Sequence, residues 1–215
     1  SMTKFSESYH EIFLISLSKS TDIFLSFLKK DKKISADFES DIKKISWYDS
    51  ENLVMERIDH LENKLYKNTN NNSKHSIFAE VSFYLLPYFE LIVKNYPYLK
   101  FVCTVKSRKK TQKDILDDYI NEKNFFMRIL TWKKKFKNHL VEHEGKKWQK
   151  DYLIDKCYPK FKSDNLEESI NQYIDTYYTK IKHFEKKYPK NLQVFYADEL
   201  KSKYGRKKIY KFINS

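Results

Sequence analysis

A short polar segment near the start of the chain carries side chains that could hold an anion. The apolar run Ile12–Ile15 is followed by Ser18, Lys19, Ser20 and Thr21, and a helical apolar pattern begins after them. Backbone N–H groups at a helix start bind phosphate or sulfate, and an ammonium group with small hydroxyls adds to them. We interpret residues 18–21 as a candidate anion clamp. The alternative is a polar turn in which Ser20 caps the helix.

A second basic cluster follows a different apolar run. Lys106 and Arg108 come directly after Phe101–Val105. Further lysines lie within the next five residues, at Lys109, Lys110 and Lys113. Such a cluster can neutralise a bound phosphate, and it can equally be the solvated basic face of a helix. Both interpretations stay open.

Secondary-structure elements that would position these residues can be read from the spacing of apolar side chains. The candidate strands are Ile12–Ile15, Ile77–Val81, Phe101–Val105 and Leu192–Tyr196. Helical spacing appears in Val54–Leu65 and in Leu166–Tyr188, and Asp164 precedes the second helix as its expected cap. Strands joined by long helical connections predict a mostly parallel sheet with helices on both faces, a three-layer α/β fold. Ligands collect at the carboxyl ends of such strands, so we expect the site where the first strand ends.

Several segments, in this order, resemble sequences of the bacterial and cyanobacterial type in the sulfotransferase family. SKSTDIFL at 18–25 is similar to the family's loop pattern PKSGTTWL, and AEVSFYL at 79–85 is similar to EKSPYYL. YPYLKFVCTVKSR at 96–108 resembles YPNAKFIVLLRDP. CYPKF at 157–161 and VFYADEL at 194–200 extend the resemblance over most of the chain.

The resemblance implies a P-loop NTPase-like fold and an enzyme. Its reaction would transfer a sulfuryl group from 3′-phosphoadenosine 5′-phosphosulfate (PAPS) to an acceptor hydroxyl or amine, leaving adenosine 3′,5′-bisphosphate. Lys19 would neutralise the bridging and leaving oxygens. The loop that holds the 5′-phosphosulfate would comprise Ser18, Lys19, Ser20, Thr21 and Asp22.

The resemblance also implies a place for the 3′-phosphate. Lys106 falls on the family's phosphate-binding arginine, Asp114 falls on its serine, and Arg108 is a possible substitute for the arginine. The acceptor would be a small molecule or a glycan.

This chain departs from the family pattern at the cofactor positions. Thr21 replaces a glycine, and Asp22 and Ile23 replace two threonines. Lys106 lacks the planar fork of arginine, and Asp114 introduces a carboxylate. A carboxylate about 4 Å from a phosphate charge costs on the order of 4 kcal/mol at an effective dielectric near 20. The departures define an alternative, a catalytically degenerate member that binds an anionic partner.

Proton transfer would need a base near the end of the second candidate strand. Glu80 is placed for that role and His75 is the alternative, while a structural hydrogen-bond acceptor is the other interpretation of Glu80. We expect no metal, because the two cysteines lie far apart and His139 and His143 have no carboxylate on their face. The P-loop kinase signature GxxxxGK[ST] is absent from the sequence, which disfavours an NTPase.

Composition sets limits on the class of protein. The 215 residues predict one domain, 1–215, in which Ser1 is a tag remnant, and 40% hydrophobic residues suffice for a packed core. Net charge is +13, but 38 of the 42 basic residues are lysine, which argues against nucleic acid as a partner and favours another anion. The sequence contains no apolar run of membrane-spanning length and no leader pattern, so we expect a cytoplasmic protein. It gives no indication of oligomeric state.

Overall fold

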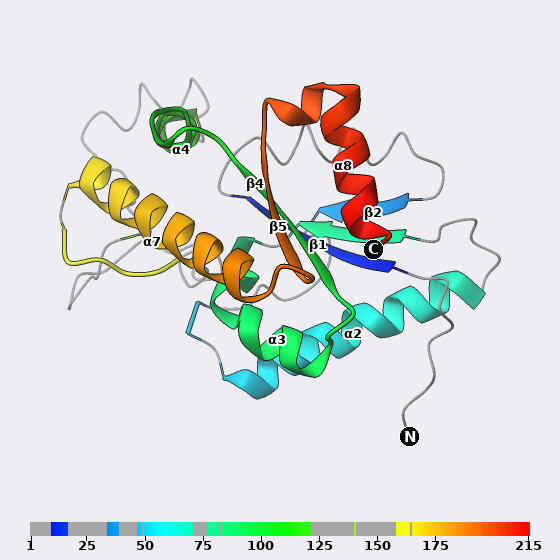
Figure 1. Ribbon diagram of the computed structural model, residues 1–215. Helices are drawn as coiled ribbons and strands as arrows, with labels where there is room; N and C mark the ends of the chain where they lie inside the picture. The colour runs from blue at the N-terminus through cyan, green and yellow to red at the C-terminus, as the bar shows by residue number, and fades with distance from the viewer. Residues whose placement is uncertain are drawn as a thin grey trace.

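The computed structural model describes residues 10–16, 34–38, 47–48, 50–70, 77–81, 83–121, 140, 158–163 and 165–215. These segments form a β-sheet with helices packed on both of its faces (Figure 1).

Five parallel strands make up the sheet, in the order β2-β3-β1-β4-β5. They are β1 (His10–Ser16), β2 (Ile34–Phe38), β3 (Ile77–Val81), β4 (Lys100–Val105) and β5 (Leu192–Tyr196). Every neighbouring pair is parallel, so the carboxyl ends of all five strands lie at one edge. The predicted α/β fold with a mostly parallel sheet is confirmed. Four of these strands were predicted from the sequence, and β2 was not.

Alternate side chains of β4 and β5 face two different layers. Phe101, Cys103 and Leu192 belong to the main hydrophobic core. Phe195 points the other way and packs on Phe212, with ring centroids 6.4 Å apart. The period-2 alternation of strands therefore supplies an apolar surface to helices on both faces.

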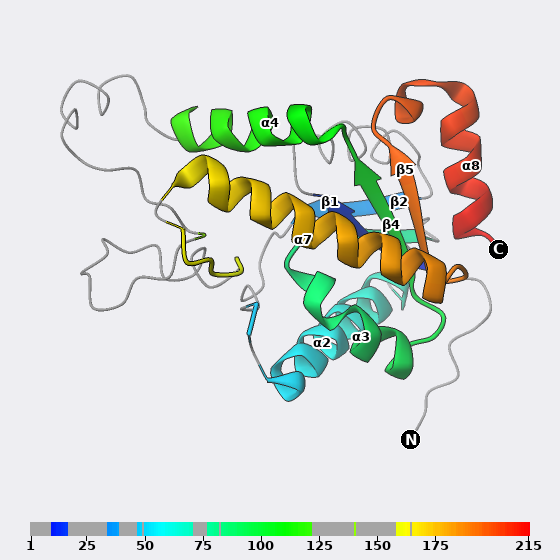
Figure 2. The same cartoon turned by 60° about the vertical axis from the view of Figure 1, so that its left-hand side comes forward.

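Helices on the two faces differ in number and packing. Those described are α2 (Glu51–Asn70), α3 (Phe89–Asn95), α4 (Arg108–Asn121), α7 (Leu166–Lys187) and α8 (Lys203–Ile213), with 3-10 turns η1 (Phe83–Tyr88) and η2 (Glu199–Lys201). In Figures 1 and 2, α2, α3 and α7 lie on one side of the sheet and α8 lies on the other. The arrangement is three-layered, as predicted.

The main core lies between the sheet and the helix layer formed by α2, α3 and α7. Phe89 at the start of α3 stacks on Phe184 of α7 at 4.7 Å and meets Phe101 of β4 edge-on at 4.8 Å. Nearer the start of α7, Tyr173 contacts the rings of Trp47 and Tyr158. The aromatic side chains thus join segments that are far apart in the sequence.

Helix α7 begins at Leu166, as expected, but its cap is a different residue from the expected one. Asn165, and not Asp164, is its cap, because the Asn165 Oδ1 accepts hydrogen bonds from the backbone N–H groups of Glu167 and Glu168 at 2.9 and 3.3 Å. Both residues are of types that cap helices well, so composition alone does not separate them.

Helix α8 begins against η2. Ser202 caps it by accepting the Gly205 N–H at 2.9 Å, and a Cβ on Gly205 would overlap the Glu199 carbonyl oxygen. Glycine is therefore required here by the close approach of two backbone segments. Across the described ranges, no helix combines the length and apolar character needed to cross a bilayer.

Candidate functional site

At the carboxyl edge of the sheet, the chain connections diverge between the neighbouring strands β1 and β4. Ser16 at the end of β1 pairs with Thr104 near the end of β4, so the two strands finish side by side. The strand that follows β1 in the sequence is β2, which is one outer strand of the sheet. The strand that follows β4 is β5, which is the other outer strand. Neighbouring parallel strands whose connections diverge in this way mark the usual ligand position in open α/β sheets.

The segment after β4 begins with an ion pair. Lys106 Nζ lies 2.5 Å from Asp114 Oδ2, and the two side chains are only 17% and 24% exposed. Asp114 stands two turns along α4, so its carboxylate folds back over the turn between β4 and α4. In the structure Asp114 therefore neutralises the cation that the sequence assigns to a phosphate.

A tyrosine of α7 fixes the same turn. The Tyr178 hydroxyl donates to the Lys106 carbonyl oxygen at 3.0 Å, and the Lys106 N–H approaches the same hydroxyl at 3.4 Å. Thr111, almost fully buried in the first turn of α4, donates its hydroxyl proton to the Tyr178 hydroxyl at 2.7 Å, and the same Thr111 hydroxyl lies 3.2 Å from the Ser107 carbonyl oxygen. These bonds hold the backbone on both sides of the turn against α7.

Burial raises the pKa of Tyr178, although its hydrogen bonds with Thr111 and Lys106 act in the opposite direction. The hydroxyl is accordingly protonated at neutral pH and serves as the donor to the Lys106 carbonyl. Sequence analysis did not identify Tyr178 or Thr111 as site residues. The only signal was the adjacent pair Tyr177 and Tyr178, which on a helix point about 100° apart, so that one can enter the core while the other reaches a neighbouring element.

The remaining cations at the start of α4 are solvent-exposed. Arg108 Nη2 pairs with Asp175 Oδ2 at 2.6 Å, and Lys110 Nζ reaches Asp198 Oδ2 at 3.4 Å. Asp198 also pairs with Lys201, and the bonds from Lys201 and Lys110 lower the pKa of its carboxyl. The exposed Lys109 and Lys113 have no ion pair among the described residues.

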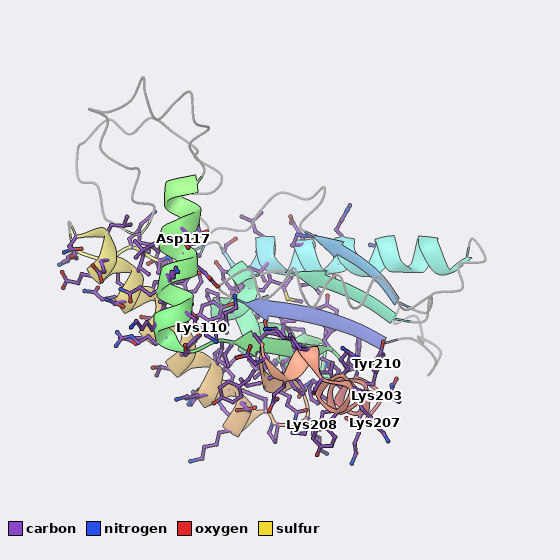
Figure 3. All side chains as sticks on the ribbon, turned by 90° about the horizontal axis from the view of Figure 1, so that it is seen from above. Lys110, Asp117, Lys203, Lys207, Lys208 and Tyr210 are labelled. Carbon is purple, nitrogen blue, oxygen red and sulfur yellow. The ribbon has the colours of Figure 1, made fainter. Side chains whose placement is uncertain are left out.

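Charges along α4 are arranged against the helix dipole. Its first turn contains basic residues and no acidic one, and its last turn contains no basic residue. The positive end of a helix dipole is stabilised by anions, so this order costs α4 stability. The same arrangement of charges concentrates positive potential at the carboxyl edge of the sheet. In Figure 3 the arrowhead of β1 points towards the start of α4, where Lys110 is labelled.

Other predicted site residues are placed only in part. Glu80 lies in β3, paired with Phe13 of β1 and Asp37 of β2, one residue before the strand ends. Its backbone is therefore at the carboxyl edge, next to β1, and its side chain lies outside the described part. His75 is outside the described residues too, as is the whole candidate loop: Ser18, Lys19, Ser20, Thr21 and Asp22.

Among the described residues, no group of three or more histidine, cysteine or carboxylate side chains could hold a metal ion. His139, His143 and Cys157 lie outside the described ranges. Cys103 is completely buried in β4, and burial raises the pKa of its thiol well above the ordinary value.

Comparison with known proteins gives likenesses among solved structures. No family model matches the chain, and no curated protein matches it. A crystal structure titled as a sulfotransferase from Alicyclobacillus acidocaldarius is similar with a TM-score of 0.46 and 10% sequence identity, over 94% of this chain and 77% of that chain. We therefore base the functional proposal on this chain's own residues.

Proposed function

We propose that this protein is a sulfotransferase-like enzyme that binds a phosphoadenosine nucleotide at the carboxyl edge of its sheet. The observation that carries the proposal is the pairing of Ser16 with Thr104 at the point where the chain connections diverge. The sequence with Lys19 follows the end of β1, and the basic turn follows the end of the neighbouring strand β4. Two anion-binding sequences far apart in the chain thereby start at adjacent strand ends.

The described turn fits the 3′-phosphate of such a nucleotide. Lys106 and Arg108 flank a turn whose backbone is held in place by Tyr178, and the start of α4 adds the positive end of its dipole. A phosphate that binds here replaces the Asp114 carboxylate as the partner of the Lys106 ammonium group. Because this pair is partly exposed, the exchange is less costly than breaking a fully buried ion pair.

PAPS, when bound, supplies the activated sulfuryl group. In the proposed reaction Lys19 stabilises negative charge on the bridging and leaving oxygens, while Ser18, Ser20 and Thr21 orient the 5′-phosphosulfate. Glu80 accepts the proton that the acceptor hydroxyl or amine loses. Catalysis of this kind relies on positioning and on fixed charges, and the residues proposed here supply both.

A second function is favoured by one specific contact. The ion pair between Lys106 and Asp114 already satisfies the central cation of the turn, and Asp22 adds another carboxylate to the candidate loop. A protein that retains the fold, binds an anion weakly and does not catalyse transfer would have these features. The experiment must therefore distinguish this catalytically degenerate binding module from the proposed enzyme.

Titration calorimetry with adenosine 3′,5′-bisphosphate tests the cofactor proposal, and adenosine 5′-monophosphate is the matched ligand without a 3′-phosphate. We expect binding of the bisphosphate at least about tenfold tighter, and loss of that difference in Lys106→Ala. The absence of bisphosphate binding at millimolar concentration and low salt would overturn the proposal. Binding of the bisphosphate without transfer from labelled PAPS to any of a panel of hydroxyl and amine acceptors would favour the binding module.

A further inference from the structure

The exposed face of α8 carries an unbalanced positive charge. Gly205, Ile209, Phe212 and Ile213 form the buried stripe of this helix. The opposite face is exposed and consists of Lys203, Tyr204, Lys207, Lys208 and Lys211, which we call the basic face of α8. Figure 3 shows the labelled lysines Lys203, Lys207 and Lys208 around α8 at the outer side of the molecule.

The charge imbalance distinguishes α8 from the other described helices. Its eleven residues contain five basic side chains and no acidic one. By contrast, α7 has four basic and four acidic residues, and α2 has three basic and four acidic residues. Helix α4 has four basic and three acidic residues, and α3 has one basic and one acidic residue. The lysine-rich composition of the whole chain therefore does not account for the basic face, because the same composition gives nearly neutral helices elsewhere.

No carboxylate in the described part of the chain forms an ion pair with the four lysines of this face. Lys203, Lys207 and Lys211 follow each other at four-residue intervals and form a stripe about 12 Å long. Lys208 lies over the ring of Tyr204, with Nζ 4.9 Å from the ring centroid. These lysine charges are thus available to a partner.

An exposed aromatic ring accompanies the charges. Tyr204 lies within the face, is 70% exposed, and has the ammonium group of Lys208 over its ring. Tyrosine rings with an apolar body and a polar tip are favoured where a protein meets lipid headgroups.

We propose that the basic face of α8 docks the protein on an anionic lipid surface. The helix packs its apolar stripe on the sheet, so the contact with lipid is electrostatic and lies in the headgroup layer, without insertion into the hydrocarbon. Lysines act as point charges and suit a diffuse negative surface, whereas recognition of individual nucleic-acid phosphates and bases favours arginine. A convex single helix also differs from the charged grooves that follow a nucleic-acid strand. This proposal does not depend on the proposed catalytic function.

Vesicle flotation with the full chain tests the docking surface. The probes are vesicles of phosphatidylcholine alone and vesicles with about one third phosphatidylserine, at about 0.1 M salt. We expect binding only to the anionic vesicles, weakening as salt increases. The variant K203Q/K207Q/K211Q should bind about tenfold or more weakly.

A matched variant separates a local surface from general attraction. K182Q/K186Q/K190Q removes three exposed lysines from the end of α7 and the turn after it, and it should bind within about twofold of the parent. Circular dichroism and melting temperature verify that both variants fold, and Tyr204→Ser gives a further test without a change of charge. Equal loss in both triple variants, binding to neutral vesicles, or no vesicle binding would each overturn the proposal. So would a single-stranded oligonucleotide that displaces the protein from vesicles at equal phosphate concentration.

Discussion

The ion pair between Lys106 and Asp114 places a carboxylate where an anionic ligand is proposed to bind. The substitution Asp114→Asn removes the charge of the carboxylate and leaves the Lys106 ammonium group available to a ligand. It should therefore raise the affinity for adenosine 3′,5′-bisphosphate. We expect about a three- to tenfold increase, measured by calorimetry at low salt. The same change should lower the free energy of unfolding by less than about 1 kcal/mol, because the pair is partly exposed.

Asp117 provides the control on the same helix. It lies one turn beyond Asp114, is labelled in Figure 3, and forms no ion pair with a described residue. Asp117→Asn removes one negative charge from α4 without releasing Lys106. An equal rise in affinity in both variants would mean that net charge alone attracts the ligand, and the ion pair would then have no specific part in the site.

At the scale of elements, Tyr178 connects α7 to the turn between β4 and α4. Tyr178→Phe removes a hydroxyl that bonds to the Lys106 carbonyl and to Thr111, so we expect it to lower the free energy of unfolding at pH 8 by about 1–2 kcal/mol. Because the folded-state pKa of Tyr178 is raised, its contribution is present below about pH 10 and is lost as pH rises above that. Urea unfolding at pH 8 and at about pH 10.5 should therefore show a smaller pH effect in Tyr178→Phe than in the parent.

Tyr188 is the matched tyrosine for this measurement. Its hydroxyl donates to Glu90 at 3.1 Å, and Glu90 keeps a second partner in Lys187. Tyr188→Phe should therefore cost less than about 0.5 kcal/mol. A cost in Tyr178→Phe as small as this would show that the turn is held by packing alone.

Elements with strong apolar patterns were predictable, and the exceptions have physical reasons. The runs at Ile77–Val81 and Leu192–Tyr196 coincide with strands, because the strands of a parallel sheet covered by helices are mostly apolar, and Glu80 and Gln193 interrupt these runs only once each. Strand β2 was missed because it is a five-residue edge strand in which Asp37 and Ser35 alternate with apolar residues. Such a short pattern resembles many surface segments, and only its pairing with β3 makes it a strand.

The candidate site was predictable to a smaller extent than the sheet. Sequence spacing located Lys106 and Arg108 at a strand end, as the structure has them. It did not predict that Asp114 would pair with Lys106 or that Tyr178 would reach the turn. Those contacts depend on how α4 and α7 pack against each other, and no local pattern encodes a distance between helices.

On the scale of the whole molecule, the core is concentrated where α3, α7 and β4 meet. Phe89 is fully buried there and touches Phe101 and Phe184, whose positions in the sequence are up to 95 residues away from it. Phe89→Ala leaves a cavity shared by three elements, and we expect it to lower the free energy of unfolding by about 3–5 kcal/mol. The total free energy of unfolding of a small protein is only about 5–15 kcal/mol, so a large fraction of the stability depends on this one ring.

Leu53→Ala on the half-exposed side of α2 is the control, with an expected cost of about 0.5 kcal/mol. Urea unfolding followed by circular dichroism measures both variants. The described sheet is continuous from β2 to β5, so unfolding of Phe89→Ala should remain a single transition in which the signals of helices and strands are lost together. If Phe89→Ala cost no more than Leu53→Ala, the aromatic cluster would not be the centre of the core. Two separate transitions would mean that the α8 side of the sheet folds independently of the α3 and α7 side.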